Sequence, residues 1–262
     1  MKDLTIEDLI EMLKQGNSHL KKMEEALDFP WEPENEDPRK LHNCYIRSLI
    51  GCYISKFSEL SELILDSIAN QNYLAYALSG RSLIEITATL RYYIITQYKP
   101  LFSKGSFNAE DFKKLIDIND KHLRGGRFDW NSFLQRQFYK LKDEAIKQLQ
   151  CKKKNQKYIA DNILQDQVNV LTCIEKWAYE VPEVLFVYNL FCDLVHPNIG
   201  SNFLVASLDS NKLYFTKKKG ELVGKIIFEQ SFLMLLSTTQ KTFNENFIYL
   251  MSTIWQDENG QT

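Results

Sequence analysis

The sequence contains none of the short motifs by which common enzyme classes are identified. It has no glycine-rich phosphate loop, no HExxH zinc motif and no GxSxG nucleophile elbow, so nothing supports a kinase, zincin or serine hydrolase. Its five cysteines are odd in number and form no CxxC pair, which argues for reduced thiols and against a zinc site. We therefore expect neither a metal nor a cofactor.

Long apolar runs are also missing. The most apolar stretch, 226–236, is interrupted by Glu229 and Gln230 and is too short to span a bilayer. No apolar segment follows Met1, so we expect no signal peptide. With 25% charged residues and a net charge of −2, the chain has the composition of a soluble globular protein. These features predict a cytoplasmic protein with no membrane partner.

Apolar residues recur at helical spacing in nearly every long segment. This pattern predicts an all-α fold, a single antiparallel helical bundle formed by residues 1–262. Residues 1–40 would hold an N-terminal helix and an acidic, proline-rich loop anchored by Trp31, and 224–255 a long C-terminal helix. The other expected helices span about 40–70, 73–98, 107–122, 130–150, 163–177 and 182–196.

Two features interrupt the helical pattern. Pro100 should stop the third helix, because proline removes a backbone hydrogen bond and clashes with the preceding turn. Between residues 202 and 215, two short apolar runs flank Asp209-Ser-Asn211. That arrangement predicts a short β-hairpin, with an irregular loop as the alternative.

The stretch 188–201 carries the first candidate site. Because Pro197 disfavours helix in the residue before it, the helix should end at His196, where the helix dipole favours the protonated imidazole. Asp193 lies one turn earlier and would orient this ring, and Asn198 adds a side-chain donor in the following turn. Alternatively, His196 only caps the helix and Asp193 faces water.

A second candidate is the pair Arg81 and Glu85, one turn apart on a face that we expect to point inward. The other members of that expected inner face are Leu74, Leu78, Ala88 and Tyr92. The pair is either a structural ion pair or an arginine prepared to meet a phosphate or a carboxylate. Gly80 beside it would permit close approach of another helix.

Positive charge concentrates in two lysine triplets. They are Lys152, Lys153 and Lys154, and Lys217, Lys218 and Lys219. Most lysine runs are solvated surface, but these two indicate weak, salt-sensitive binding of a polyanion.

Two of these stretches together resemble a known group. Gly80-Arg-Ser-Leu-Ile-Glu85, and Tyr188 to Asn198 with its Val-His-Pro-Asn ending, resemble bacterial helical proteins described as HEPN-like. The resemblance covers 73–202 and implies a HEPN-like core within the bundle. In HEPN proteins four to six residues separate an arginine from the histidine that follows it, whereas the corresponding positions upstream of His196 are Asn189, Leu190 and Phe191.

The resemblance implies a protein that acts on or binds RNA, as a metal-independent endoribonuclease in phage defence or a toxin–antitoxin pair. His196 would then move a proton and Arg81, brought from another helix, would stabilise the phosphorane charge. Glu85, Asp193 and Asn198 complete the expected catalytic set. The implied partners are RNA, an antitoxin or defence-system subunit, and a second copy of the chain. The alternative function is a non-catalytic helical module that binds a protein partner or a small ligand.

Overall fold

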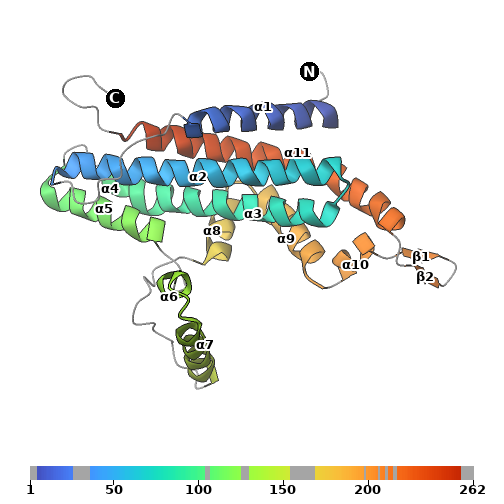
Figure 1. Cartoon of the computed structure of the whole chain (residues 1–262). Helices are drawn as coiled ribbons and strands as arrows, with labels where there is room; N and C mark the ends of the chain where they lie inside the picture. Colours follow the sequence, from blue (N-terminus) through green and yellow to red (C-terminus); the bar gives the residue numbers. More distant parts are fainter. Residues whose placement is uncertain are drawn as a thin grey trace.

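The computed structural model is an all-α bundle with one short β-hairpin (Figure 1). It describes residues 5–25, 36–103, 107–124, 130–153, 169–197, 199–205, 207–209, 212–214 and 217–254. Four long elements run side by side as the body of the bundle: α1 (Ile6–Glu25), α2 (Pro38–Ala69), α3 (Tyr73–Tyr92) and α11 (Lys217–Met251). The π-helix η1 (Tyr93–Tyr98) continues α3, and α4 (Lys99–Phe102) follows it. The remaining elements are α5 (Ala109–Arg124), α6 (Trp130–Leu134), α7 (Phe138–Lys153), α8 (Val170–Ala178), α9 (Glu183–Val195), α10 (Ile199–Val205), β1 (Ser207–Asp209) and β2 (Lys212–Tyr214).

Local capping chemistry begins several of these helices. The Asp8 amide donates to Thr5 Oγ1 at 3.1 Å and the Thr5 amide donates to Asp8 Oδ2 at 3.0 Å, which is a reciprocal capping box at the start of α1. Pro38 occupies the first turn of α2, where its missing N–H costs nothing. The turn into α3 places Gln71 at φ 50°, and Asn72 then accepts from the Ala75 amide.

Helix α3 is the centre of the bundle, because α2, α8, α9 and α11 all pack against it. Its buried residues include Tyr76, Gly80, Leu83 and Ile84. The expected inner face is therefore wrong in part: Leu74 is 40% exposed and Leu78 is 47% exposed. A helix surrounded by four neighbours is apolar around most of its circumference, so its sequence period does not select one inward stripe.

The chain does not leave the helical conformation at Pro100. Instead η1 widens the helix, with the Lys99 amide donating to the Ile94 carbonyl, and α4 continues to Phe102. A proline inside a helix conflicts with the carbonyl four residues earlier, and a π-turn absorbs that conflict without ending the helix. The prediction that Pro100 stops the third helix is therefore wrong.

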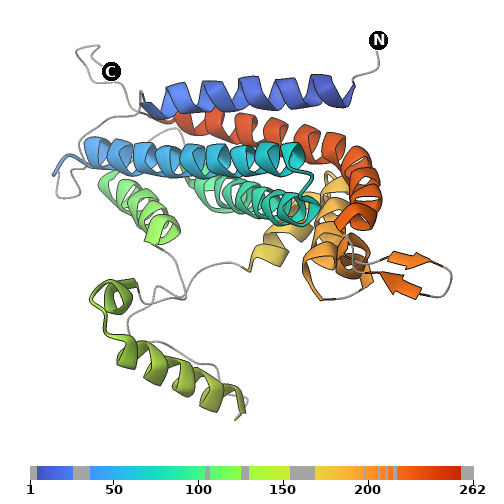
Figure 2. The ribbon, with the colours of Figure 1, turned by 45° about the vertical axis from the view of Figure 1, so that its right-hand side comes forward.

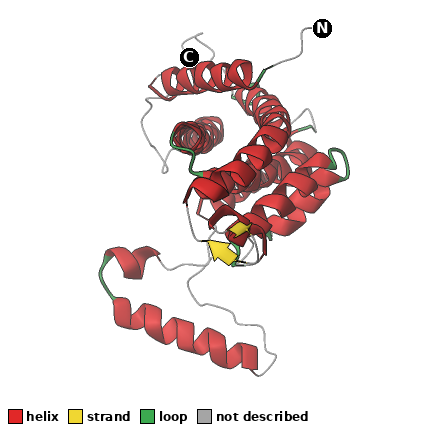
Figure 3. Ribbon diagram, turned by 90° about the vertical axis from the view of Figure 1, so that its right-hand side faces the viewer, coloured by secondary structure: helices red, strands yellow, loops and turns green. Residues whose placement is uncertain are grey.

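Helices α6 and α7 form an arm that stands away from the bundle in all three ribbon views (Figures 1, 2 and 3). Arg136, at φ 56°, lies in the turn between them, where one continuous helix was expected. Several apolar side chains on this arm are at least 40% exposed: Phe133, Leu134, Phe138, Tyr139, Ile146 and Leu149. The arm follows α5 and precedes α8 in the chain.

The hairpin is confirmed, with Ser207 opposite Tyr214 and Asp209 opposite Lys212. Helix α11 begins at Lys217, seven positions before the expected start at 224, because a single glycine at position 220 costs a helix only about 1 kcal/mol. Trp31, residues 163–168 and Trp255 lie outside the described residues. In the described part of the chain, we find no helix that is both long and apolar enough to cross a bilayer.

Candidate functional site

The helix end at His196 has the predicted backbone. Helix α9 ends at Val195, His196 turns to an extended conformation at ψ 151°, and its amide donates to the Cys192 carbonyl at 3.0 Å. Its side chain is exposed. Among the described residues, no side-chain hydrogen bond or ion pair involves the imidazole.

Arg81 and Glu85 form the expected ion pair, with Arg81 Nε donating to Glu85 Oε1 at 2.8 Å. Both side chains keep a little over a quarter of their surface in solvent, so the pair is not buried. The Tyr188 hydroxyl donates to the same carboxylate oxygen at 3.2 Å, and the Arg81 guanidinium carbon lies 5.6 Å from the Tyr188 ring centroid. Burial raises the pKa of Tyr188 to about 12, with further contributions from Cys192 and Glu85.

The cluster of Arg81, Glu85 and Tyr188 has no described contact with His196. His196 lies eight residues beyond Tyr188, or about 12 Å of helix rise. Asp193 is exposed and turns toward α10, where a Cβ added at Gly200 would lie 2.0 Å from Asp193 Oδ2. The described hydrogen bonds and ion pairs thus join Arg81 and Glu85 to Tyr188, and none joins them to Asp193 or His196.

The remaining predicted residues are only partly described. Lys153 is exposed at the end of α7. Lys154, Asn198 and the side chain of Lys152 lie outside the described part, as do the side chains of Lys217–Lys219, whose backbone forms the first turn of α11. The described residues contain no group of three or more His, Cys, Asp or Glu that could hold a metal ion.

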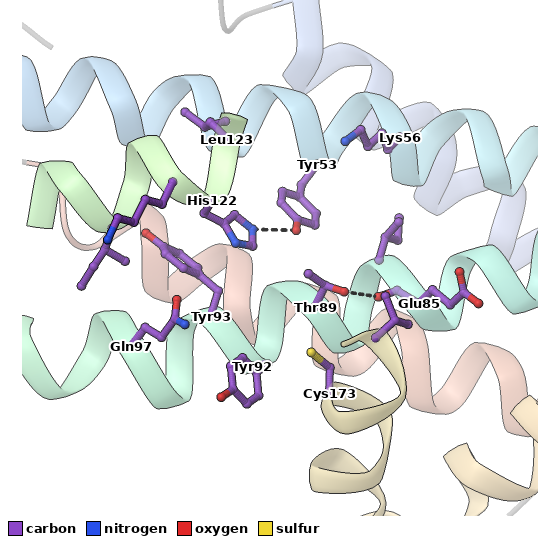
Figure 4. Close-up of a pocket in the computed structure, with 14 residues that line it drawn as sticks. Tyr53, Lys56, Glu85, Thr89, Tyr92, Tyr93, Gln97, His122, Leu123 and Cys173 are labelled. Atoms are coloured by element: carbon purple, nitrogen blue, oxygen red, sulfur yellow. Dashed lines mark hydrogen bonds between the residues drawn. The ribbon is translucent and has the colours of Figure 1, made fainter. Parts of the chain in front are cut away.

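Sequence reasoning missed a cavity of about 590 Å³ between α2, α3, η1, α5 and α8 (Figure 4). It adjoins the ion pair, because Glu85 and Thr89 form part of its wall. Its rings and cations come from four elements: Tyr53 and Lys56 of α2, Tyr92 of α3, Tyr93 of η1, and Lys121 and His122 of α5. Figure 4 shows Tyr53 and His122 pointing toward each other, whereas the Tyr92 ring points away from them.

The aromatic groups of the cavity are fixed by one another. The His122 ring stacks on Tyr93 at a centroid distance of 4.3 Å and on Tyr53 at 5.7 Å. His122 Nε2 also lies 2.8 Å from the Tyr53 hydroxyl oxygen, as the dashed line in Figure 4 marks. On the other side, Lys176 of α8 holds its ammonium 4.8 Å from the Tyr92 ring centroid. The cavity is therefore lined by aromatic rings that largely cover one another, with the Lys56 ammonium 5.9 Å from the Tyr53 ring centroid.

Burial shifts the pKa of three titratable groups in the cavity wall. Burial, reinforced by Lys56, lowers the pKa of His122 to about 4. Burial raises the pKa of the Cys173 thiol to about 11 and that of Tyr53 well above its ordinary value. All three groups are neutral at pH 7, whereas a general acid or base works best with a pKa near the working pH.

Two signals in the sequence could have pointed to this cavity. Pro100 in an otherwise helical segment indicates a local distortion, and π-turns occur often at functional sites. His122, a lone histidine at the end of a helix, is the other signal. Its pairing with Tyr53, 69 residues away, depends on tertiary packing.

Comparison with known proteins adds no relative. No protein-family model matches the chain, and no curated protein or solved structure shows significant similarity to it.

Proposed function

We propose that the protein binds single-stranded RNA, with one nucleotide in the cavity and the adjoining strand along the α6–α7 arm. The observation that carries this proposal is that the cavity is lined by the two helix ends that precede and follow the α6–α7 arm in the chain. The last turn of α5, with Lys121 and His122, and the first turn of α8, with Val170 and Cys173, line the cavity and also flank the arm in the chain.

The arm has the surface that a single strand requires. Phe138 and Tyr139 are 56% and 64% exposed. Exposed lysines lie on the same helix, namely Lys140, Lys142, Lys147 and Lys153. Single-stranded nucleic acids bind where aromatic side chains stack on bases and cations follow the backbone. The cavity repeats this combination, with the Lys56 ammonium 5.9 Å from the Tyr53 ring centroid and with Tyr92 and Lys121 elsewhere in its wall.

The proposal is binding without cleavage at His196. The exposed imidazole has no described side-chain partner, and Arg81 is engaged by Glu85 and Tyr188. A nuclease requires both groups at one phosphate.

The test is fluorescence anisotropy with a short labelled RNA of mixed sequence, compared with unlabelled AMP as competitor. Tyr92→Leu removes the flat ring and should weaken RNA binding roughly 5- to 150-fold, the equivalent of one stacked base. Lys147→Glu with Lys153→Glu should weaken binding and reduce its salt dependence, by about 0.7 in the logarithmic slope for each lost phosphate contact. Lys22→Glu, on exposed α1 at the far side of the bundle, is the matched control and should change nothing.

The two functions differ in one outcome. If AMP binds and Tyr92→Leu weakens its binding, but the arm variants leave the affinity for RNA unchanged, the protein is a small-ligand module. If neither RNA nor AMP binds, the cavity has no nucleotide function.

A further inference from the structure

A second cavity lies on the other side of η1. It measures about 910 Å³ and is bounded by η1, the turn between α8 and α9, and α11. Whereas Tyr93 and Gln97 of η1 line the first cavity, Ile94 and Ile95 line this one. We propose that it binds a small monocarboxylate with an apolar body, and that Arg91 holds the carboxylate. This inference does not depend on RNA binding.

Arg91 is the group that carries the proposal. It ends α3, its side chain is only 11% exposed, and Nη2 lies 2.5 Å from Glu180 Oε1. In the part of the chain that the structure describes, this ion pair is the only polar contact of the guanidinium. Arginine has five N–H donors, and a carboxylate accepts two of them in parallel. The Arg91 guanidinium is therefore largely buried in the cavity wall and keeps N–H donors without a partner among the described residues. Such a group suits a ligand that has two acceptor oxygens.

A second donor in the same wall lacks an acceptor. Asn246 of α11 is 6% exposed, lines the cavity, and has a buried Nδ2 without a hydrogen-bond partner among the described residues. Buried amides are normally paired, because an unpaired donor has lost its hydrogen bonds to water and gained none in the protein. Arg91 and Asn246 thus both carry side-chain donors for which the described residues supply no acceptor.

The charges and the apolar wall narrow the ligand class. Lys99 and Lys241 accompany Arg91, but Glu180, Glu183 and Glu245 line the cavity as well, so the site is close to neutral. A nucleotide or other polyanion would meet these three carboxylates, whereas a single negative charge fits beside the guanidinium. The wall also has an apolar part, formed by Ile94, Ile95, Trp177, Val181, Leu233 and Met234, beside the hydroxyl-bearing Ser237, Thr238, Thr242 and Tyr249. An aliphatic body would bury its surface there.

The test is titration calorimetry of the full chain with octanoate, and with 1-octanol as the neutral analogue. Octanoate should bind saturably at one site per chain, and octanol about tenfold or more weakly, since it lacks the charge-assisted hydrogen bonds. Arg91→Met should reduce octanoate affinity by a similar factor. Arg91→Lys keeps a charge without the planar fork and should fall between the two.

Glu180→Gln separates recognition from structure. It breaks the ion pair while leaving Arg91 in place, and Glu180 is 67% exposed, so the fold should survive. Octanoate should then bind as tightly as to the natural chain or more tightly. If Glu180→Gln and Arg91→Met reduced octanoate affinity equally, the ion pair would support the structure of the cavity and Arg91 would not recognise the carboxylate. That result, equal binding of octanol, or no binding of octanoate would each overturn the proposal.

Discussion

Two glycines in the middle of helices allow the packing of α3 against α9 to be measured directly. A Cβ added at Gly80 of α3 would lie 2.6 Å from Phe191 Cε2 and 3.2 Å from Leu235 Cδ2. A Cβ added at Gly51 of α2 would meet nothing within 4 Å. The same substitution, glycine to alanine, thus enters a tight contact at one position and open space at the other.

The magnitudes follow from two opposing effects. Alanine stabilises a helix interior over glycine by about 0.5–1 kcal/mol, so Gly51→Ala should raise the free energy of unfolding by that amount. Gly80→Ala gains the same, but Phe191 is fully buried against Tyr76 at a centroid distance of 5.4 Å and has little room to retreat. Overpacking of a core costs roughly 1–3 kcal/mol. We therefore expect Gly80→Ala to be about 1–3 kcal/mol less stable than Gly51→Ala, because the helix contribution cancels in the comparison.

Urea unfolding followed by circular dichroism measures this difference, with equal m-values as the check that only stability has changed. Phe191→Leu should also be less harmful in the Gly80→Ala background than in the natural chain, with a coupling of about 0.5 kcal/mol or more. Equal stability of the two alanine variants would refute the reasoning. It would mean that the distance between α3 and α9 does not depend on the missing Cβ.

Four further predictions concern stability. Burial lowers the pKa of His42 to about 4, below the roughly 6.5 of an unfolded chain. The contribution of His42 to the free energy of unfolding is therefore complete above pH 6.5 and is lost as pH falls toward 4, by up to about 3 kcal/mol. Urea unfolding measured at a series of acid pH values should show a flatter pH dependence for His42→Gln. Arg81→Ala should cost about 1 kcal/mol or less in the same assay, because its pair with Glu85 is partly solvated; a loss above 3 kcal/mol would indicate a buried pair. His196→Ala should stay within about 0.5 kcal/mol of the natural chain, as expected for an exposed side chain. Asn72→Ala should lower the thermal midpoint through loss of about 1 kcal/mol of capping, whereas Asn72→Asp, which keeps the acceptor, should not.

Features that depend on neighbours in the chain were readable from the sequence. Thr5 with Asp8 caps α1 as predicted, and Pro197 ends α9 before His196. The pairing of Arg81 with Glu85 one turn away was predicted for the same reason. Each of these involves groups within a few positions of one another, so backbone geometry alone brings them together.

Tertiary packing decided the rest. The sequence placed Leu78 on the inner face of α3, but four helices surround α3 and its exposed side is set by the gaps between them. The cavity joins Tyr53 to His122 across 69 residues, and its walls come from five elements whose relative positions no local pattern encodes. Burial in that assembly also makes His122 neutral at pH 7, a property of the folded environment and not of the residue.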